Sequence, residues 1–598
     1  MHMNKWRLLL RCIKLSISLI YKSSGLWVVV YFLLSLVAST LGLALTYALK
    51  YLLDTLTVES VLIQNVILWI TIYIVILLIT QANQSIQNIL YDTIFKKAEH
   101  LYDCNLAEKL SELPLSVIDS SDGKDMVEDV RYSKNTSVYL TYQLVRIFSL
   151  VYAFTVAITA LIAFNVWFSL LMLVLTVPGM ILLLVYDKKA ENLRREQAPD
   201  VRKFCYYRWM LTDPWPAKDV RMYDLTEPIR KRYDEVKGEY ISANKRLDKK
   251  KLLSMLFAET ILRAGEIVFT VFVVAKALHG EIGIGDVALY TGLALSVVNA
   301  FEGFMNIGLM TYTRTTEVMS RIFEFFAIST EGNIGTRYLN EFESLEFQNV
   351  CFKYPHTDKY VLNGVSFTLN KGDKLSLVGI NGSGKTTIIK LMLGLYEIES
   401  GKILINGHPM PDYDIRDVRK MFSVLFQNFV QYPLSLRDNI ALSDYDRVLD
   451  DDAVTASLKQ SGVYDELQKK LANGLDSFMT RQFDDKGTEL SRGQWQKIAL
   501  SRAYFKNADI LIFDEPSAAL DAEAEDRIFK NFEGISEGKT GIMISHRISA
   551  ARMSNKIIVL DGGIITECGS HDELVSKNGL YAELYNLQKD KYRLEVMW

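Results

Sequence analysis

The sequence predicts an all-α domain of about six transmembrane helices, followed by an α/β domain built around a phosphate-binding loop. Long apolar segments recur through the first half of the chain. In the second half, short β-type runs alternate with helical segments, which is the pattern of an α/β fold. The glycine-rich stretch Gly379–Thr387 directly follows the apolar run Leu375–Val378, as a P-loop follows its strand.

The composition indicates neither a nucleic-acid partner, nor a disulfide-rich fold, nor a metal centre. The 598 residues suffice for about three to four average domains. A net charge of −3 gives no indication of a nucleic-acid partner. The five cysteines are scattered without the spacing of a disulfide framework, and the seven histidines form no metal-ligand cluster.

The N-terminal stretch Met1–Tyr21 mixes lysine and arginine with leucine and isoleucine. This pattern indicates an amphipathic segment lying on the cytoplasmic membrane surface. It lacks the small-x-small cleavage site of a signal peptide, so we expect an uncleaved anchor.

The apolar segments each offer about 20 residues or more, enough to cross a hydrocarbon core of about 30 Å. Several in succession make buried soluble helices an improbable alternative. The predicted spans are Leu26–Leu53, Val61–Thr80, Val138–Phe164, Trp167–Tyr186, Leu252–Leu278 and Val287–Leu309.

The placement of lysine and arginine predicts the orientation in the membrane. Neither residue occurs in the expected outer connections Asp54–Ser60, Asn165–Val166 and His279–Asp286. Both are frequent in Phe95–Lys134 and Asp187–Lys251. We therefore expect these two regions and both termini in the cytoplasm.

The two basic regions have few helix breakers and are expected to extend the spanning helices into the cytoplasm. Each pair of extensions is joined at a candidate turn, Leu113–Asp122 or Leu211–Tyr223. The turns are either a solvated charged face or docking elements for the second domain. Their position between helix pairs favours docking.

Ionisable residues within the apolar segments are costly, at about 2.5–3.5 kcal/mol for a charge at mid-bilayer. Glu259 and Arg263 are four apart and are expected to neutralise each other. Glu266 and Glu302 have no obvious local partner, so we expect them either to line a transport cavity for cationic cargo or to form interhelical hydrogen bonds. The remaining charges lie near helix ends and are expected to snorkel to the interface, namely Lys50, Arg146 and Lys276.

The stretch Gly379–Thr387 has the spacing Gly-x-x-x-x-Gly-Lys-Thr. Its glycines allow successive backbone N–H groups to surround a phosphate, and the helix expected at Thr387–Leu395 adds its positive end. Lys385 is expected to reach the β- and γ-phosphates, and Thr386 to ligate Mg²⁺. The residues predicted to bind the nucleotide here are Gly379, Asn381, Gly382, Ser383, Gly384, Lys385, Thr386 and Thr387.

The polar, glycine-bearing stretch Ile328–Thr336 breaks the helical pattern and marks a boundary. We expect a membrane domain at 1–330 and a nucleotide-binding domain at 331–598. β-type runs at Leu345–Phe352 and Val365–Leu369 follow the boundary.

Further candidate residues follow in a fixed order. The apolar run Asp509–Glu515 ends in two acids, of which Asp514 is suited to Mg²⁺ and Glu515 to orienting or deprotonating a water. Tyr354 precedes the P-loop and is expected to stack on adenine. Other segments of this set are Leu425–Asn428 with Gln427, Leu490–Gln494, Ser517–Asp521 and Ile544–Arg547.

This set of motifs resembles the ATP-binding-cassette (ABC) superfamily over the whole second half of the chain. The resemblance implies that Gln427 binds Mg²⁺ or the attacking water and relays the ATP state to the membrane domain. Leu490–Gln494 would be the signature motif, whose Ser491, Gly493 and Gln494 contact ATP held by an opposite cassette. His546 would be the switch histidine and Asp521 the D-loop acid.

Membrane helices preceding a cassette are similar to the exporter-type (type IV) half-transporters of this superfamily. Lys218–Tyr223 resembles their second coupling region, and Gly569–Leu574 their usual C-terminal end. The sequence departs from the pattern at Arg492, where the signature usually has glycine, and at Phe483–Gly487, which replaces Val-Gly-Glu-x-Gly.

Because Glu515 and His546 are both present, the simplest assembly is a homodimer with two equivalent ATP sites. ATP sandwiched between the cassettes would close them, the docking turns would pass closure to the helices, and hydrolysis would reset the cycle.

The resemblance is closest to bacterial bacteriocin or lanthipeptide exporters of the cytoplasmic membrane. Only Met1–Gly25 precedes the first span, so we expect no N-terminal peptidase domain. A multidrug or lipid exporter is the next alternative, and an ATP-gated channel or regulator a more distant one. The apolar spans exclude a soluble ABC ATPase, and family importers usually carry their two domain types on separate chains.

Overall fold

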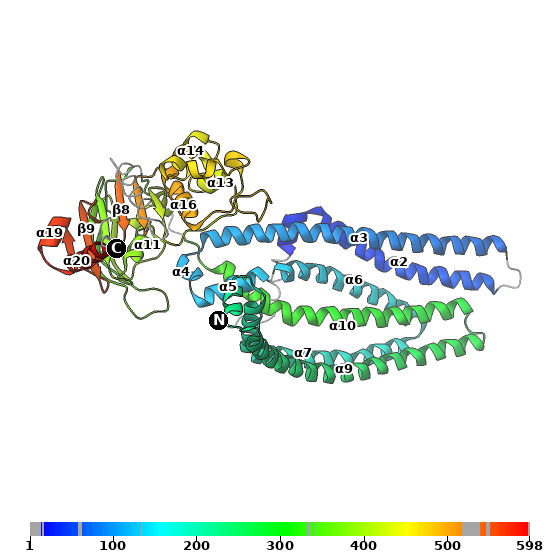
Figure 1. Ribbon diagram of the computed structural model, residues 1–598. Helices are drawn as coiled ribbons and strands as arrows, with labels where there is room; N and C mark the ends of the chain where they lie inside the picture. The colour runs from blue at the N-terminus through cyan, green and yellow to red at the C-terminus, as the bar shows by residue number, and fades with distance from the viewer. Residues whose placement is uncertain are drawn as a thin grey trace. The chain divides into compact units, whose positions relative to one another are not determined.

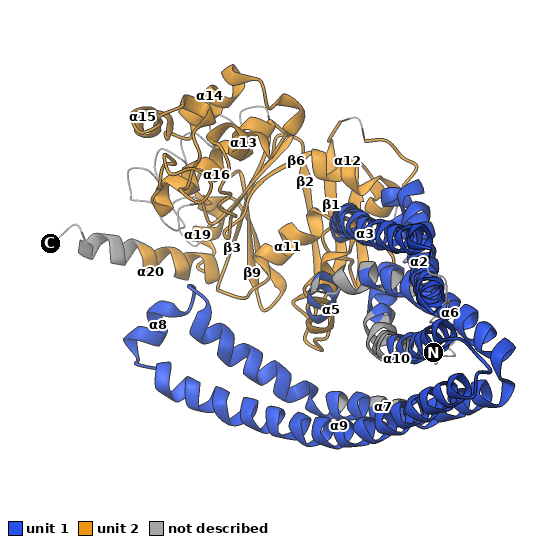
Figure 2. Cartoon of the chain, turned by 90° about the vertical axis from the view of Figure 1, so that its right-hand side faces the viewer, with its two compact units in different colours: residues 1–111, 125–328 blue, residues 112–124, 329–598 orange. Residues whose placement is uncertain are grey.

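A computed structural model of the chain describes residues 14, 17–57, 62–132, 134–331, 335–339, 341–516, 539–545 and 551–595. The chain divides into two compact units, coloured separately in Figure 2. Unit 1 comprises residues 1–111 and 125–328, and unit 2 comprises residues 112–124 and 329–598. Most of the predicted amphipathic stretch Met1–Tyr21 lies outside the described residues, although residues 17–21 are helical.

Unit 1 consists of long helices, with α7 packed along α9 and α6 along α10 (Figure 1). Most of them extend well beyond the predicted apolar spans, as expected for cytoplasmic extensions. The short α8 lies within the predicted turn Leu211–Tyr223. The helices are α2 (Leu26–Leu56), α3 (Ile63–Glu112), α5 (Ser121–Tyr132), α6 (Lys134–Phe164), α7 (Val166–Thr212), α8 (Ala217–Met222), α9 (Thr226–Leu278) and α10 (Ile284–Ala327).

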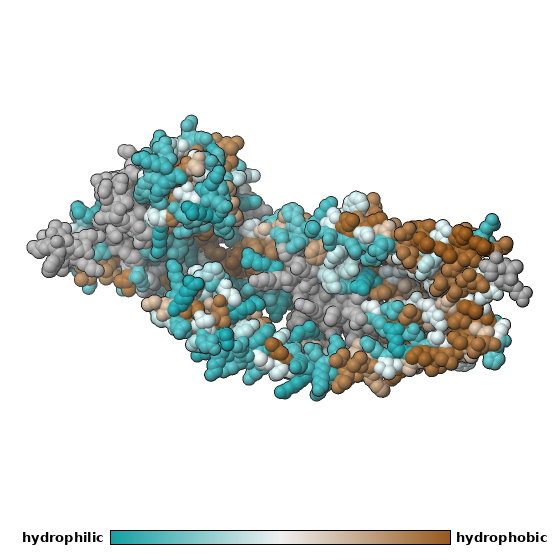
Figure 3. Space-filling model, turned by 45° about the vertical axis from the view of Figure 1, so that its right-hand side comes forward, coloured by the Kyte–Doolittle hydropathy of each residue, from teal (hydrophilic) through white to brown (hydrophobic). Residues whose placement is uncertain are grey.

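Five helices of the described chain are long and apolar enough to cross a membrane, namely α2, α3, α6, α7 and α10. The side chains of Leu78, Trp167 and Ile267 are 61%, 79% and 63% exposed. Figure 3 shows apolar surface gathered at the end of unit 1 near the connection of α2 to α3. Such extensive apolar exposure indicates contact with lipid or with another protein surface.

The sixth predicted span, Leu252–Leu278, lies in α9 and is not among these five helices. Its apolar run is interrupted by Glu259, Arg263 and Glu266. Membrane crossing by α9 therefore stays a prediction, supported by its packing along α7.

Arg263 corrects two expectations about charges in the apolar segments. Its Nη1 donates to Glu266 Oε2 at 2.9 Å, and its Nη2 donates to Glu302 Oε1 of α10 at 2.8 Å. The expectation that these carboxylates lack a local partner is wrong, as is the pairing of Arg263 with Glu259. Glu266 lies one turn from Arg263 on the same face, whereas the contact with Glu302 depends on helix packing that sequence spacing does not show.

The two basic residues near predicted outer connections are also paired. Lys50 of α2 forms an ion pair with Asp286 of α10, and Lys276 pairs with Glu281 at 2.9 Å. Asp54 accepts a hydrogen bond from the backbone N–H of Gly285 at 3.0 Å. The contacts of Lys50 and Asp54 hold the end of α2 against the start of α10.

Unit 2 contains a six-stranded sheet of order β10-β9-β3-β8-β7-β6 and a four-stranded sheet of order β2-β1-β4-β5. Strands β9, β3, β8, β7 and β6 pair in parallel. They are mostly buried apolar runs, as a parallel sheet covered on both faces requires. The strands are β1 (Ser344–Phe352), β2 (Leu362–Asn370), β3 (Lys374–Gly379), β4 (Ser400–Ile405), β5 (His408–Pro409), β6 (Phe422–Leu425), β7 (Ile510–Asp514), β8 (Thr540–Ile544), β9 (Lys556–Asp561) and β10 (Ile564–Gly569).

The helix after the P-loop is α11, Lys385–Met392, which begins and ends earlier than the predicted Thr387–Leu395. It ends there because Gly394 has a φ of +59°, and the N–H of Leu395 turns back to the carbonyl of Lys390 at 2.9 Å. The other α-helices of unit 2 are α4 (Leu115–Ile118), α12 (Ile415–Lys420), α13 (Leu436–Ala441), α14 (Asp451–Gln460), α15 (Tyr464–Gln468), α16 (Arg492–Lys506), α19 (His571–Ser576) and α20 (Leu580–Glu595).

The segment 112–124, which includes α4, folds as part of unit 2. Leu115 packs against the main apolar core of this unit, and the hydroxyl of Tyr396 donates to Asp119. The backbone N–H of Glu331 donates to the carbonyl of Glu112 at 2.7 Å. The predicted turn Leu113–Asp122 is therefore a docked element rather than a solvated face.

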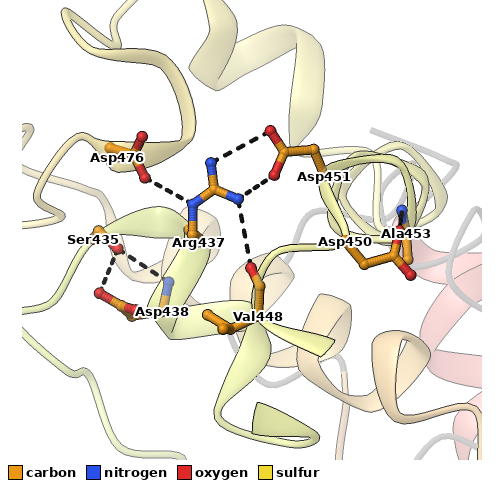
Figure 4. Close-up of polar contacts among 8 residues, drawn as sticks. All are labelled: Ser435, Arg437, Asp438, Val448, Asp450, Asp451, Ala453 and Asp476. Carbon is orange, nitrogen blue, oxygen red and sulfur yellow. Dashed lines mark hydrogen bonds and ion pairs between the residues drawn. The ribbon is translucent and has the colours of Figure 1, made fainter. Parts of the chain in front are cut away.

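Arg437 connects three neighbouring segments of unit 2 (Figure 4). Its Nε donates to Asp476 at 2.7 Å, and its Nη1 donates to Asp451 at the start of α14 and to the carbonyl of Val448. The Arg437 side chain is only 16% exposed. Because one planar guanidinium serves all three acceptors, lysine is not an equivalent replacement.

We expect Arg437→Lys to lower the unfolding free energy by about 1–3 kcal/mol, since a lysine ammonium cannot reach the same acceptors together. Thermal unfolding of the full-length protein in detergent should show Tm lowered by about 2–8 °C. The control is Arg416→Lys, because the Arg416 side chain is 73% exposed and pairs with Asp414 nearby in sequence. Equal Tm values for the two variants would contradict the assigned role of Arg437.

Candidate nucleotide site

The P-loop begins where β3 ends at Gly379 and closes where α11 begins at Lys385. Gly382 and Gly384 have φ values of +79° and +104°, which side chains other than glycine rarely adopt. A Cβ on Gly384 would lie 2.6 Å from the Leu362 side chain. These glycines let the loop curl tightly ahead of the positive end of α11, which suits an anion.

The polar side chains of the loop fit a polyphosphate. Ser383 is 1% exposed, and its Oγ has no hydrogen-bond partner among the described residues. Lys385 Nζ donates to the carbonyls of Gly379 and Ile380, both at 2.9 Å. Burial lowers the pKa of Lys385, so a bound phosphate would favour its charged form more than these carbonyls do. Asn381 is exposed at the tip of the loop, while Thr387 is buried in α11.

The carboxylate pair lies at the end of β7. Asp514 is 1% exposed, and its Oδ1 lies 3.4 Å from Thr386 Oγ1. Hydroxyl and carboxylate oxygens are the ligands that Mg²⁺ prefers, so the Thr386–Asp514 pair fits that ion. The arrangement resembles a site completed by phosphate oxygens more than a cage made of protein alone.

Glu515 follows Asp514 with a φ of +52°, an uncommon backbone conformation for a residue other than glycine. Its Oε2 accepts a hydrogen bond from Gln427 Nε2 at 2.6 Å. Gln427 comes from the segment after β6, at the same edge of the sheet. The structure thus brings together three segments that are far apart in sequence, which carry Lys385 and Thr386, Gln427, and Asp514 and Glu515.

Tyr354 contacts α11, the helix that follows the P-loop. Its hydroxyl lies 3.1 Å from Thr387 Oγ1, and its ring packs edge-on against the rings of Phe352 and Tyr396. The ammonium of Lys390 lies 5.3 Å from the centre of its ring. Tyr396 in turn donates to Asp119 of the docked segment. Sequence reasoning missed Tyr396, because its contacts with Tyr354 and Asp119 join segments that are remote in sequence.

The residues predicted to form the signature motif lie at the start of α16. Ser491 is the N-cap, with its Oγ accepting from the Gln494 N–H at 3.3 Å, and Gln494 Oε1 accepts from the Ser491 N–H at 3.1 Å. Gln494 Nε2 also donates to Glu466 at 3.4 Å. Among the described residues, Ser491, Gly493 and Gln494 form no hydrogen bond with the P-loop of their own chain. Arg492 is exposed at the first helical position.

A half-buried arginine connects α16 to the segment that follows Gln427. Arg502 donates from Nε and Nη2 to Asn439 at 2.8 and 2.7 Å, and from Nη1 to the carbonyl of Val430 at 2.9 Å. Burial lowers the pKa of Arg502 to about 10. Gln496 of α16 also donates to the carbonyl of Pro516, next to Glu515. Sequence reasoning missed these contacts. The signal that could have indicated them is the presence of polar residues on the buried face of α16.

Two predicted site residues, Asp521 and His546, lie outside the described residues. The strands that precede them, β7 and β8, end at the same sheet edge as β3. Their roles stay predictions.

Comparisons with known proteins match both units. Residues 362–518 match the family described as ABC transporter, and residues 28–301 match the ABC transporter transmembrane region. One solved structure, described as a bacterial Atm1-family ABC exporter with ATP bound, aligns with a TM-score of 0.77 at 22% identity. It covers 94% of this chain and 98% of the other, so the two share a fold.

Similar proteins include the subtilin transport ATP-binding protein SpaT of Bacillus subtilis, 32% identical over 80% of this chain and 78% of that protein. The nisin transport ATP-binding protein NisT of Lactococcus lactis subsp. lactis is 27% identical over 95% of both chains. An ATP-dependent lipid A-core flippase of Xylella fastidiosa is 31% identical over 62% of both chains.

We expect Tyr354→Ala to weaken ATP binding by about 5–150-fold, because stacking of a base on an aromatic ring contributes about 1–3 kcal/mol. Tyr354→Phe keeps the ring and loses only the contact of its hydroxyl with Thr387, so its Kd should stay close to that of the unmodified protein. Equilibrium binding of a fluorescent ATP analogue measures both values. Similar losses in the two variants would show that the hydroxyl, rather than stacking, is what matters.

Proposed function

Because this chain belongs to the ABC transporter family and has the fold of an ABC exporter, we propose that two copies of it use ATP hydrolysis to export a peptide across the bacterial cytoplasmic membrane. It is a multi-pass membrane protein with an ATPase domain coupled to transport.

The observation that carries the proposed chemistry is the meeting of the P-loop with Asp514, Glu515 and Gln427. Gly379–Thr387 would bind the phosphates of ATP, with Lys385 leaving its two carbonyl acceptors for the β- and γ-phosphate oxygens. Thr386, Asp514 and Gln427 would hold Mg²⁺, which supplies positive charge to the phosphates when bound. Tyr354 would stack on the adenine.

Glu515 is the proposed base that orients and deprotonates the attacking water. In this structure its carboxylate is held by Gln427 at 2.6 Å. When Gln427 turns toward the bound nucleotide, that hydrogen bond breaks and Glu515 becomes available to water. His546 would assist at the γ-phosphate, and Asp521 would contact the opposite cassette, as the family resemblance implies.

The signature residues support a site shared between two copies. Ser491, Gly493 and Gln494 lie at the positive end of α16, which suits phosphate oxygens. They bond to one another and to Glu466 rather than to their own P-loop. We propose that they close the ATP site of the second copy, in a symmetric homodimer.

Segment 112–124 provides the proposed connection to the membrane helices. It continues α3 and folds with unit 2, where Asp119 accepts from Tyr396 and Tyr396 touches Tyr354. A movement of unit 2 would therefore displace the end of α3. We propose that residues 1–330 carry out membrane transport and that residues 331–598 hydrolyse ATP, as the predicted domain boundary divides them.

A peptide of the bacteriocin type is the proposed cargo, because the relatives SpaT and NisT carry names for subtilin and nisin transport. The similarity to a lipid A-core flippase supports a lipid exporter as the second candidate. We further propose that both termini face the cytoplasm, since lysine and arginine are concentrated in the helix extensions on that side.

We expect Glu515→Gln to retain ATP binding and to lower ATP hydrolysis by at least about 100-fold, because it keeps the side-chain shape and removes the base. With ATP bound, this variant should also remain as a closed dimer, detected by cross-linking or size-exclusion chromatography. Phosphate release by the purified full-length protein measures the turnover.

Glu397→Gln is the matched control, because Glu397 is an exposed acid of unit 2 away from the carboxylate pair. Its ATPase rate should equal that of the unmodified protein. Normal turnover by Glu515→Gln would exclude Glu515 as the base.

A further inference from the structure

Unit 1 contains a cavity of about 240 Å³ between α6, α7 and α10. Its lining is almost entirely apolar. The residues that line it are Leu150, Val151, Phe154, Thr176, Ala300 and Phe301. An engineered apolar cavity of about 150 Å³ binds benzene, so this one has room for an aromatic or branched side chain.

Thr176 is the single polar residue of the lining, and its hydroxyl donates to the carbonyl of Leu173 at 2.7 Å. The cavity therefore offers a water molecule few hydrogen bonds. An apolar group gains free energy by leaving water for such a site, at roughly 25 cal/mol per Å² of surface removed from water.

The ion-pair network of Arg263 lies at the same level of α10 as part of the cavity lining. Phe301 lines the cavity and packs against a small apolar cluster that includes Leu262. The next residue along each helix, Glu302 on α10 and Arg263 on α9, belongs to the network. A Cβ on Gly303 would lie 3.0 Å from Leu150, so α10 also approaches the α6 wall of the cavity at this level.

The network carries an excess of negative charge. One guanidinium, that of Arg263, is shared by the carboxylates of Glu266 and Glu302 at 2.9 and 2.8 Å. The three side chains are 40%, 19% and 31% exposed, so they are not sealed inside the helix packing. No further cation pairs with them among the side chains that the structure describes. Because lipid would penalise these charges, their exposed side must face water or another charged group.

From the apolar cavity and the negative charge at the same level of α10, we infer a cargo site in unit 1 for a group that carries a positive charge next to a bulky apolar side chain. This inference rests on the proposed export function and specifies its cargo. The apolar side chain occupies the cavity, and the cationic group pairs with the carboxylate charge that Arg263 does not neutralise. A basic, apolar peptide segment has this chemistry, and so does a lipophilic small cation.

The same electrostatics disfavours an anionic lipid headgroup at this position. A phosphate beside Glu266 and Glu302 would meet two carboxylates with only one guanidinium to offset them. Between the two candidate cargoes, this site therefore favours a cationic peptide.

The test is binding of a labelled peptide of alternating lysine and leucine to the purified full-length protein, followed by fluorescence anisotropy without nucleotide. Glu302→Gln removes the excess charge and leaves the pair of Arg263 with Glu266, and should weaken binding at least about tenfold. Val151→Trp and Thr176→Leu fill the cavity and should each weaken binding by a similar factor. Glu259→Gln, an exposed acid on the same helix α9 outside the network, should bind as the unmodified protein does.

Two comparison peptides complete the test. A glutamate–leucine peptide and a lysine–serine peptide should both bind at least about tenfold more weakly than the lysine–leucine peptide. If tetraphenylphosphonium displaces the lysine–leucine peptide, the site also accepts small lipophilic cations. If it does not displace the peptide, the site is specific for peptides.

The inference is overturned if the lysine–leucine peptide does not bind the unmodified protein, or binds no better than the glutamate–leucine peptide. It is equally overturned if Glu302→Gln and both cavity-filling variants bind like Glu259→Gln. Basal ATPase activity, measured on the same preparations, shows whether each variant is folded. Because that activity tests the proposed function separately, loss of peptide preference with normal ATPase would refute only the cargo site.

Discussion

The carboxyl ends of β3, β6 and β7 meet at one edge of the six-stranded sheet, and the chemistry of the molecule depends on this convergence. The P-loop follows β3, Asp514 and Glu515 lie at the end of β7, and Gln427 lies in the segment after β6. Parallel strands necessarily end on the same side, where helix N-termini also collect. The contacts of Thr386 with Asp514 and of Gln427 with Glu515 follow from this topology.

The second constraint is that a piece of the membrane chain is folded into the ATPase unit. Segment 112–124 leaves α3, docks Leu115 against the core of unit 2 and presents Asp119 to Tyr396. From Tyr396, ring contacts and a hydroxyl contact continue through Tyr354 to Thr387 at the start of α11. Arg502 likewise ties α16 to the segment that follows Gln427. These contacts connect α11 to segment 112–124, and α16 to the segment that follows Gln427.

The sequence predicted most fully those features that depend on local spacing. The P-loop, the carboxylates after β7 and the turn at Leu113–Asp122 were found because each is a contiguous motif with its own composition. The partners of Glu266 and Glu302 were missed, because the contact of Arg263 with Glu302 joins helices α9 and α10 and depends on their packing. Tyr396 and Asn439 were missed for the same reason, since their contacts come from segments remote in sequence. The end of α11 was misplaced because the positive φ of Gly394 acts earlier than the apolar pattern suggests.

The proposed function requires that ATP hydrolysis in unit 2 drives net movement of the peptide across the membrane. The most direct test of this requirement is uptake of a labelled lysine–leucine peptide into inside-out proteoliposomes that contain the full-length protein. We expect ATP to raise the internal peptide concentration above the external one, and a non-hydrolysable ATP analogue not to do so. Uptake that stops at equal concentrations, whichever nucleotide is present, would contradict this expectation and indicate a gated channel.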